Sequence, residues 1–213
     1  MQFKEYIPLA RVTLKELPLH EHFVHMTMGV VGEVAGELVD AMKKAFIYGK
    51  TRDLINEMEE FGDACWYIAN LMPEMEVSPT VLQHAVEKGY EAGAAEVAAW
   101  QAAGSPLPRL ALAITQLSIS LGAMMLELVQ RVDDGKFTPG DAKSAATVEV
   151  IGQIMGFIAG MLGIDVAQAL DRNIAKLKAR YGDKFTQQAA LQRDLSAERT
   201  ALEGGGEASH QSV

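Results

Sequence analysis

Apolar residues recur every three or four positions along nearly the whole chain, which is the spacing of one face of an α-helix. No segment sustains the alternation of apolar and polar residues that is typical of half-buried strands. The pattern therefore predicts an all-α fold, a helical bundle of about six main helices. We expect these helices at residues 20–46, 52–72, 79–103, 109–132, 139–162 and 165–181.

Capping residues and helix breakers set the predicted boundaries. Gly49 can end the first helix, Thr51 can cap the second, and the Thr138-Pro139 pair can start the fifth. Residues 104–108, rich in glycine and proline, are predicted to link two halves, 1–103 and 109–185. Residues 186–213 are expected to form a weakly helical to disordered tail, with helix reaching about Leu202 and mobility from Gly204 onward.

The two halves resemble each other when the sequence is shifted by 90 residues, because eight residues of the first half then meet identical residues. The pairs are Gly32 and Gly122, Glu37 and Glu127, Leu38 and Leu128, Val39 and Val129, Glu59 and Glu149, Gly62 and Gly152, Ile68 and Ile158, and Ala69 and Ala159. A degenerate tandem repeat would let two helical hairpins pack as a pseudo-dimer. The alternative is shared helical patterning without a common repeat.

The composition limits the partners that we expect. The 19 basic residues are outnumbered by 28 acidic ones, and a net charge of -9 disfavours binding to a nucleic acid polymer or to an anionic membrane. The one cysteine, Cys65, cannot form a disulfide within the chain, and no signal-like segment opens the sequence, so we expect a cytoplasmic protein. The apolar segment 151–164 is too short to span a bilayer, so we expect no membrane insertion.

Acidic residues gather on two consecutive predicted helices. Glu33, Glu37 and Asp40 are spaced i, i+4 and i+7, which confines them to one stripe, and Glu60 and Asp63 share a face of the next helix. In an antiparallel hairpin these carboxylates can face one another and would need a positive charge among them. Oxygen ligands alone select a hard cation such as Mg²⁺, with Mn²⁺ as a substitute. A solvated charged face is the alternative, although the apolar neighbours of these acids disfavour it.

The segments 32–44 and 59–68 resemble the MazG-type all-α nucleoside triphosphate pyrophosphohydrolases. Members of that family carry Glu-x-x-Glu on one helix and Glu-x-x-Asp on the next. Glu37 and the pair Glu60 and Asp63 fit these motifs, whereas Glu33 stands four residues before Glu37 rather than three. The resemblance implies that Glu33, Glu37, Glu60 and Asp63 bind the metal ion.

A second region of resemblance lies in residues 163–181, which are similar to the closing helix of the family. It implies that Asn173, Lys176 and Arg180 meet the phosphates of the substrate. In the second half the acids are mostly absent, since Glu33, Asp40, Glu60 and Asp63 align with Ala123, Gln130, Val150 and Gln153. We therefore expect one composite site per chain, with acids from the first half and bases from the second.

The implied reaction is hydrolysis of a ribonucleoside or deoxyribonucleoside triphosphate to the monophosphate and pyrophosphate. Glu59 or Asp40 is the candidate proton acceptor, and Trp66 is either a base-stacking residue or a packing residue. We expect the chain to work as a homodimer. The alternative function is a catalytically decayed relative that binds nucleotide or another protein as a regulatory module.

Overall fold

The computed structural model describes residues 1–104, 106–182, 186 and 194–203, and every regular element in these ranges is helical, which confirms the all-α prediction. The elements are α1 (Phe3–Arg11), α2 (Leu19–Val31), η1 (Gly32–Leu38), α3 (Val39–Tyr48), α4 (Leu54–Met75), α5 (Pro79–Ala102), α6 (Pro106–Asp133), α7 (Ala142–Leu162), α8 (Val166–Tyr181) and α10 (Leu195–Leu202).

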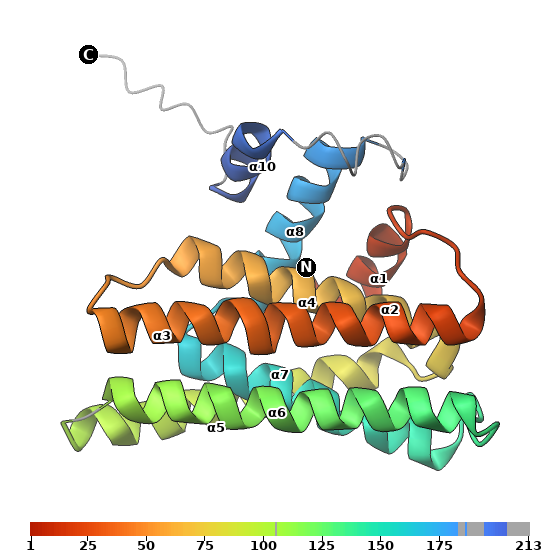
Figure 1. Cartoon of the computed structure of the whole chain (residues 1–213), viewed down its shortest axis with the longest axis horizontal. Coiled ribbons are helices and arrows are strands. Elements are labelled where there is room, and N and C mark those ends of the chain that lie inside the picture. The colour runs from red at the N-terminus through yellow and green to blue at the C-terminus, as the bar shows by residue number, and fades with distance from the viewer. Residues whose placement is uncertain (105, 183–185, 187–193, 204–213) are drawn as a thin grey trace.

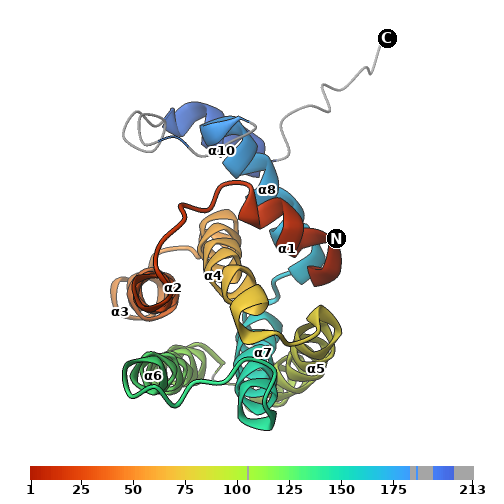
Figure 2. The same cartoon turned by 90° about the vertical axis from the view of Figure 1, so that its right-hand side faces the viewer.

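The helices form layers around one apolar core. Figure 1 shows that α2, η1 and α3 form one continuous rod that runs alongside α6. Figure 2 shows α4 and α7 in the next layer, α5 beyond α7, and α8 rising away from the bundle toward α1 and α10. Phe23, Phe61, Ile114, Leu121 and Ile158 are among the side chains that fill the space between the layers. The acidic helices α2–η1 and α4 are therefore held as neighbours by a shared core.

Several helix boundaries differ from the sequence prediction. The cap of α4 is Asp53 rather than Thr51, and that of α7 is Asp141 rather than Thr138, because each aspartate accepts a hydrogen bond from the backbone N–H three residues later. Pro73 lies inside the last turns of α4. Helix α1 was not predicted, and α6 begins at Pro106, within the segment predicted to be a linker.

Two long helices cross with their backbones in contact. Gly89 and Gly93 of α5 face α7, and Gly152, Gly156 and Gly160 of α7 face α5. A Cβ atom at Gly156 would lie 2.0 Å from the carbonyl oxygen of Val86. Glycine at this position is therefore required for the approach of the two helices.

Two helices are long and apolar enough to span a membrane by length and composition alone, a test that core helices of soluble proteins also pass. They are Leu107–Asp133, with mean hydropathy 1.7, and Ala142–Leu162, with mean hydropathy 1.6. Glycine, serine, threonine and glutamine interrupt the apolar runs of these helices without making the helices polar. The apolar window of α7 is 56% buried, as in a core helix, whereas that of α6 is only 28% buried.

Candidate metal centre and adjoining pocket

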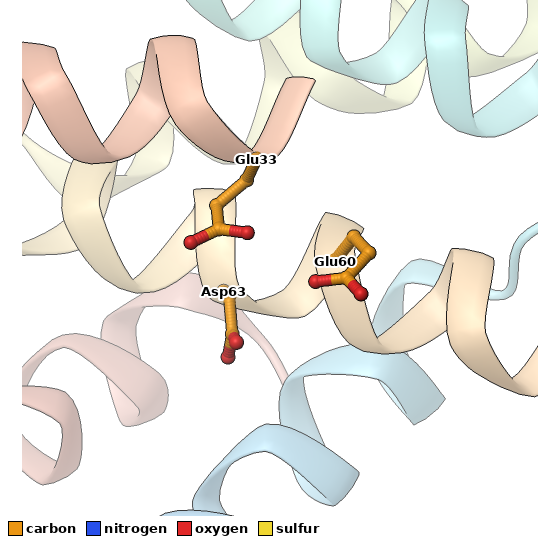
Figure 3. A group of neighbouring side chains, drawn as sticks. All are labelled: Glu33, Glu60 and Asp63. Atoms are coloured by element: carbon orange, nitrogen blue, oxygen red, sulfur yellow. The ribbon is translucent and has the colours of Figure 1, made fainter. Parts of the chain in front are cut away.

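Three carboxylates from two helices converge at the interface of η1 and α4. Figure 3 shows Glu33 of η1 facing Glu60 and Asp63 of α4. One oxygen atom from each of these side chains lies within 4.8 Å of the others, and all three residues are partly buried. The structure thus brings together three of the four predicted metal ligands.

The backbone around Glu33 forms a π-helical segment, in which each turn is wider than in an α-helix. Val34 and Leu38 of this segment are buried in the core, which fixes the orientation of the turn. Glu33 lies at the side of the turn that faces α4, whereas Glu37, one turn later, is exposed and is not part of the converging group. The role of Glu37 as a metal ligand stays a prediction.

Helix α8 brings two predicted substrate-binding residues onto the acids. Lys176 is fully buried, and its Nζ lies 2.5 Å from both carboxylate oxygens of Asp63 and 3.3 Å from Oε1 of Glu59. Nδ2 of Asn173 donates to Oδ1 of Asp63 over 2.6 Å. The site therefore combines acids of the first half with a base and an amide of the second, the juxtaposition that the sequence analysis anticipated.

Tyr6 of α1 completes this network, and the sequence analysis missed it. The Tyr6 hydroxyl is buried and donates to Oδ1 of Asn173 over 2.7 Å, so that the amide nitrogen of Asn173 points at Asp63. Burial raises the pKa of Tyr6 well above its usual value, which keeps the hydroxyl a donor. No local pattern could reveal this contact, because Tyr6 and Asn173 are 167 positions apart.

Burial and mutual repulsion favour the protonated forms of two of the acids. The pKa of Glu33 is raised to about 7, first by desolvation and then by the nearby charge of Asp63. The same two causes, in the same order, raise the pKa of Glu60 to about 8. A bound cation would reverse this preference. A donor set made only of carboxylate oxygens fits a hard divalent ion such as Mg²⁺.

The two candidate proton acceptors differ in their surroundings. Asp40 pairs with Lys43 and Lys44, and hydrogen bonds from these lysines lower its pKa to about 2. Asp40 is not among the three converging acids, and its role as proton acceptor stays a prediction. Glu59 lies beside the cluster, where it accepts a hydrogen bond from Lys176.

A cavity of about 260 Å³ opens beside Asp63. Its lining combines basic side chains with aromatic rings. The lining residues are Thr13, Lys15, His25, Asp63, Trp66, Tyr67, Leu177, Arg180 and Tyr181. Two of the predicted substrate-binding residues, Trp66 and Arg180, thus lie at this cavity.

Neighbouring helices fix the orientation of both residues. Nε1 of Trp66 donates to the carbonyl of Ala10 and to the hydroxyl of Thr13, which ties the indole to the end of α1. Arg180 makes a two-pronged ion pair with Glu198 of α10, at 2.8 and 2.5 Å. The guanidinium is therefore already paired with a carboxylate in this structure.

One histidine, His25, also lines the cavity. Burial, and then the charges of His22 and Lys15, lower the pKa of His25, so its ring is neutral near neutral pH. Its Nδ1 atom is buried and has no hydrogen-bond partner among the described residues. The adjacent Tyr67 ring packs across Gly29, where a Cβ would lie 2.2 Å from the ring. Gly29 therefore makes room for one wall of the cavity.

No protein family, curated protein or solved structure with which the chain was compared matches it.

Proposed function

We propose that this chain is a Mg²⁺-dependent hydrolase that cleaves a nucleoside triphosphate to the monophosphate and pyrophosphate. One observation carries the proposal: Glu33, Glu60 and Asp63 converge beside a cavity lined by basic and aromatic side chains. The acids suit a divalent ion, and the basic residues suit the phosphates that such an ion accompanies. The motif resemblance to the MazG-type enzymes agrees with this assignment.

Glu33, Glu60 and Asp63 would hold the ion. Bound Mg²⁺ would supply Lewis-acid chemistry, polarising a phosphoryl oxygen and lowering the pKa of a bound water. Lys176 and Arg180 would neutralise phosphate charge, and Glu59 would accept the proton of the attacking water. Asn173, held by Tyr6, orients Asp63.

The aromatic part of the cavity suits a nucleobase. The Trp66 and Tyr67 rings meet edge to face, with centroids 5.0 Å apart. Each ring can offer apolar surface to a heterocycle, and the unpaired Nδ1 of His25 can form a hydrogen bond with its edge. Trp66 therefore acts as a substrate-binding residue in this proposal.

The test is the release of pyrophosphate from a panel of ribonucleoside and deoxyribonucleoside triphosphates, with Mg²⁺, with Mn²⁺ and with EDTA. We expect release from at least one substrate with metal and none with EDTA. The Glu60→Gln variant should lose the activity, and Glu149→Gln, a control at the acid of the second half that aligns with Glu59, should keep it. Metal-dependent nucleotide binding without pyrophosphate release would instead support the decayed regulatory module.

A further inference from the structure

We propose that the outward face of α6 binds a second copy of this chain, with the two α6 helices antiparallel about a two-fold axis at Ile119. The inference rests on the surface pattern of α6 and is independent of the proposed reaction. It names the surface through which the expected homodimer would form.

An apolar stripe runs along the outside of α6. Leu112, Ile119 and Leu126 are 60, 66 and 61% exposed, although each is a large apolar side chain. Their spacing of seven residues is close to two helical turns, so they lie in one line. No charged residue occurs between Arg109 and Glu127. Isolated exposed leucines need no explanation, but a regular, uncharged stripe of this length does.

The stripe borders a hollow between α3 and α6. Gly122, on the adjoining side of α6, faces Val31. The rod formed by α2, η1 and α3 therefore lies beside α6, as Figures 1 and 2 also show. Near Leu112 the surface contains a hollow of about 330 Å³. Two of the side chains that line it, Phe46 and Ile47, are 44 and 61% exposed.

Antiparallel pairing makes this surface complementary to itself. With the axis at Ile119, Leu126 of the second copy lies opposite Leu112, where the hollow can receive it. The same pairing sets Arg109 against the end of the second α6 that carries Glu127. Parallel pairing would set like charges together and leave the hollow facing another hollow. A self-complementary patch is the hallmark of a two-fold dimer.

The dimensions suit a stable dimer. Helix α6 has 28 residues and is about 42 Å long. A strip of that length has to be about 20 Å wide to reach the roughly 800 Å² per partner of a standard interface. That is about the width of two packed helices, and α6 with the neighbouring α2–α3 rod provides it. A lipid surface fits less well, because the stripe is bounded by one basic residue, Arg109, at one end and by the acidic Glu127 at the other, and the chain carries a net charge of -9.

Sedimentation velocity of the full chain at micromolar concentration tests the proposal. We expect a dimer for the wild type and at least a hundredfold weaker association for Ile119→Glu, because two carboxylates would then meet on the axis. The matched control Leu54→Glu changes an equally exposed residue of α4 and should stay dimeric. An unchanged far-ultraviolet circular dichroism spectrum of Ile119→Glu shows that the helical fold is intact. A monomeric wild type, or a dimeric Ile119→Glu protein, overturns the proposal.

Cysteine cross-linking with an added thiol oxidant tests the orientation, since two thiols lose two electrons to the oxidant as the disulfide forms. Ile119→Cys should link to itself, and a mixture of Leu112→Cys and Leu126→Cys should give the mixed dimer. Self-linking of Leu112→Cys overturns the antiparallel pairing. The wild type is also tested for binding to vesicles of phosphatidylcholine and phosphatidylglycerol. Vesicle binding that the Ile119→Glu variant loses would assign the stripe to a membrane and overturn the proposal.

Discussion

Two helix crossings in this molecule share the same contact between a glycine and a backbone carbonyl but differ in the residues beside that contact. At the first, Gly62 of α4 faces the carbonyl oxygen of Ala169 in α8; at the second, Gly152 of α7 faces the carbonyl oxygen of Leu82 in α5. Ala169 lies four residues after the cap Asp165, and Leu82 lies four residues after the cap Ser78. The two crossings thus have matching positions relative to their caps, and the tandem repeat itself stays a prediction.

The residues next to these contacts show where the crossings diverge. Counted from the caps of α8 and α5, Lys176 corresponds to Gly89, and under the shift of 90 residues Asp63 corresponds to Gln153. Where the first crossing holds a buried ion pair, a Cβ at Gly89 would lie 2.2 Å from the carbonyl oxygen of Gln153. Losing the long side chain lets the two helices close on each other. The α4–α8 crossing, with its Lys176–Asp63 ion pair, is called the charged crossing below. The α5–α7 crossing, with its direct backbone contacts, is called the backbone crossing.

The largest expected effect is on catalysis at the charged crossing. Asp63→Asn should lower metal-dependent turnover at least about a hundredfold, equivalent to about 2.7 kcal/mol, because it removes a ligand charge. It should also destabilise the protein, since it leaves the buried Lys176 with Glu59 alone. Pyrophosphate release and thermal unfolding measure the two effects. Gln153→Ala is the control at the other crossing, and equal losses in both variants would contradict the comparison.

The next effect is on stability at the backbone crossing. Gly156→Ala should cost about 1–3 kcal/mol, because its Cβ meets the backbone of Val86. Gly62→Ala should cost less, since its nearest neighbours would be 3.2 Å away and include the Asn173 side chain. Urea unfolding compares the two variants. A greater destabilisation by Gly62→Ala would reverse the assignment of the tighter crossing.

The acid cluster was predictable because its residues obey short-range spacing on two helices. The correspondence between α5 and α8 escaped an ungapped comparison, because the following cap lies 16 positions after Gly62 but only 13 positions after Gly152. Tyr6 and His25 were missed because their roles depend on packing between distant segments. The π-helical turn that separates Glu33 from Glu37 also has no simple sequence signature.

A third effect concerns the base at the edge of the cavity. Arg180→Ala should lower kcat/KM by about tenfold, or about 1.4 kcal/mol, through lost phosphate binding. Mn²⁺ affinity, measured by titration, should not change, because Arg180 is paired with Glu198 rather than with the acid cluster. Full activity of the Arg180→Ala variant would show that Arg180 does not bind the substrate phosphates.

The smallest effect is the pH dependence of stability without metal. Glu33 and Glu60 have raised pKa values of about 7 and 8, so the folded chain keeps protons that the unfolded chain loses near the ordinary value of 4.5. Stability should therefore fall as the pH rises from about 5 to 8, and Glu60→Gln should weaken this trend. Mg²⁺ should raise the unfolding temperature more at pH 8 than at pH 5. An equal rise at both values would contradict the assignment of these carboxyls as ligands.

The central claim is that divalent metal binds at the charged crossing alone, and a Mn²⁺ titration followed by electron paramagnetic resonance tests it most directly. The account predicts that Glu60→Gln and Asp63→Asn strongly weaken Mn²⁺ binding, whereas Glu149→Gln, at the backbone crossing, leaves it unchanged. Wild-type affinity in Glu60→Gln and Asp63→Asn, or loss of binding in Glu149→Gln, would contradict it.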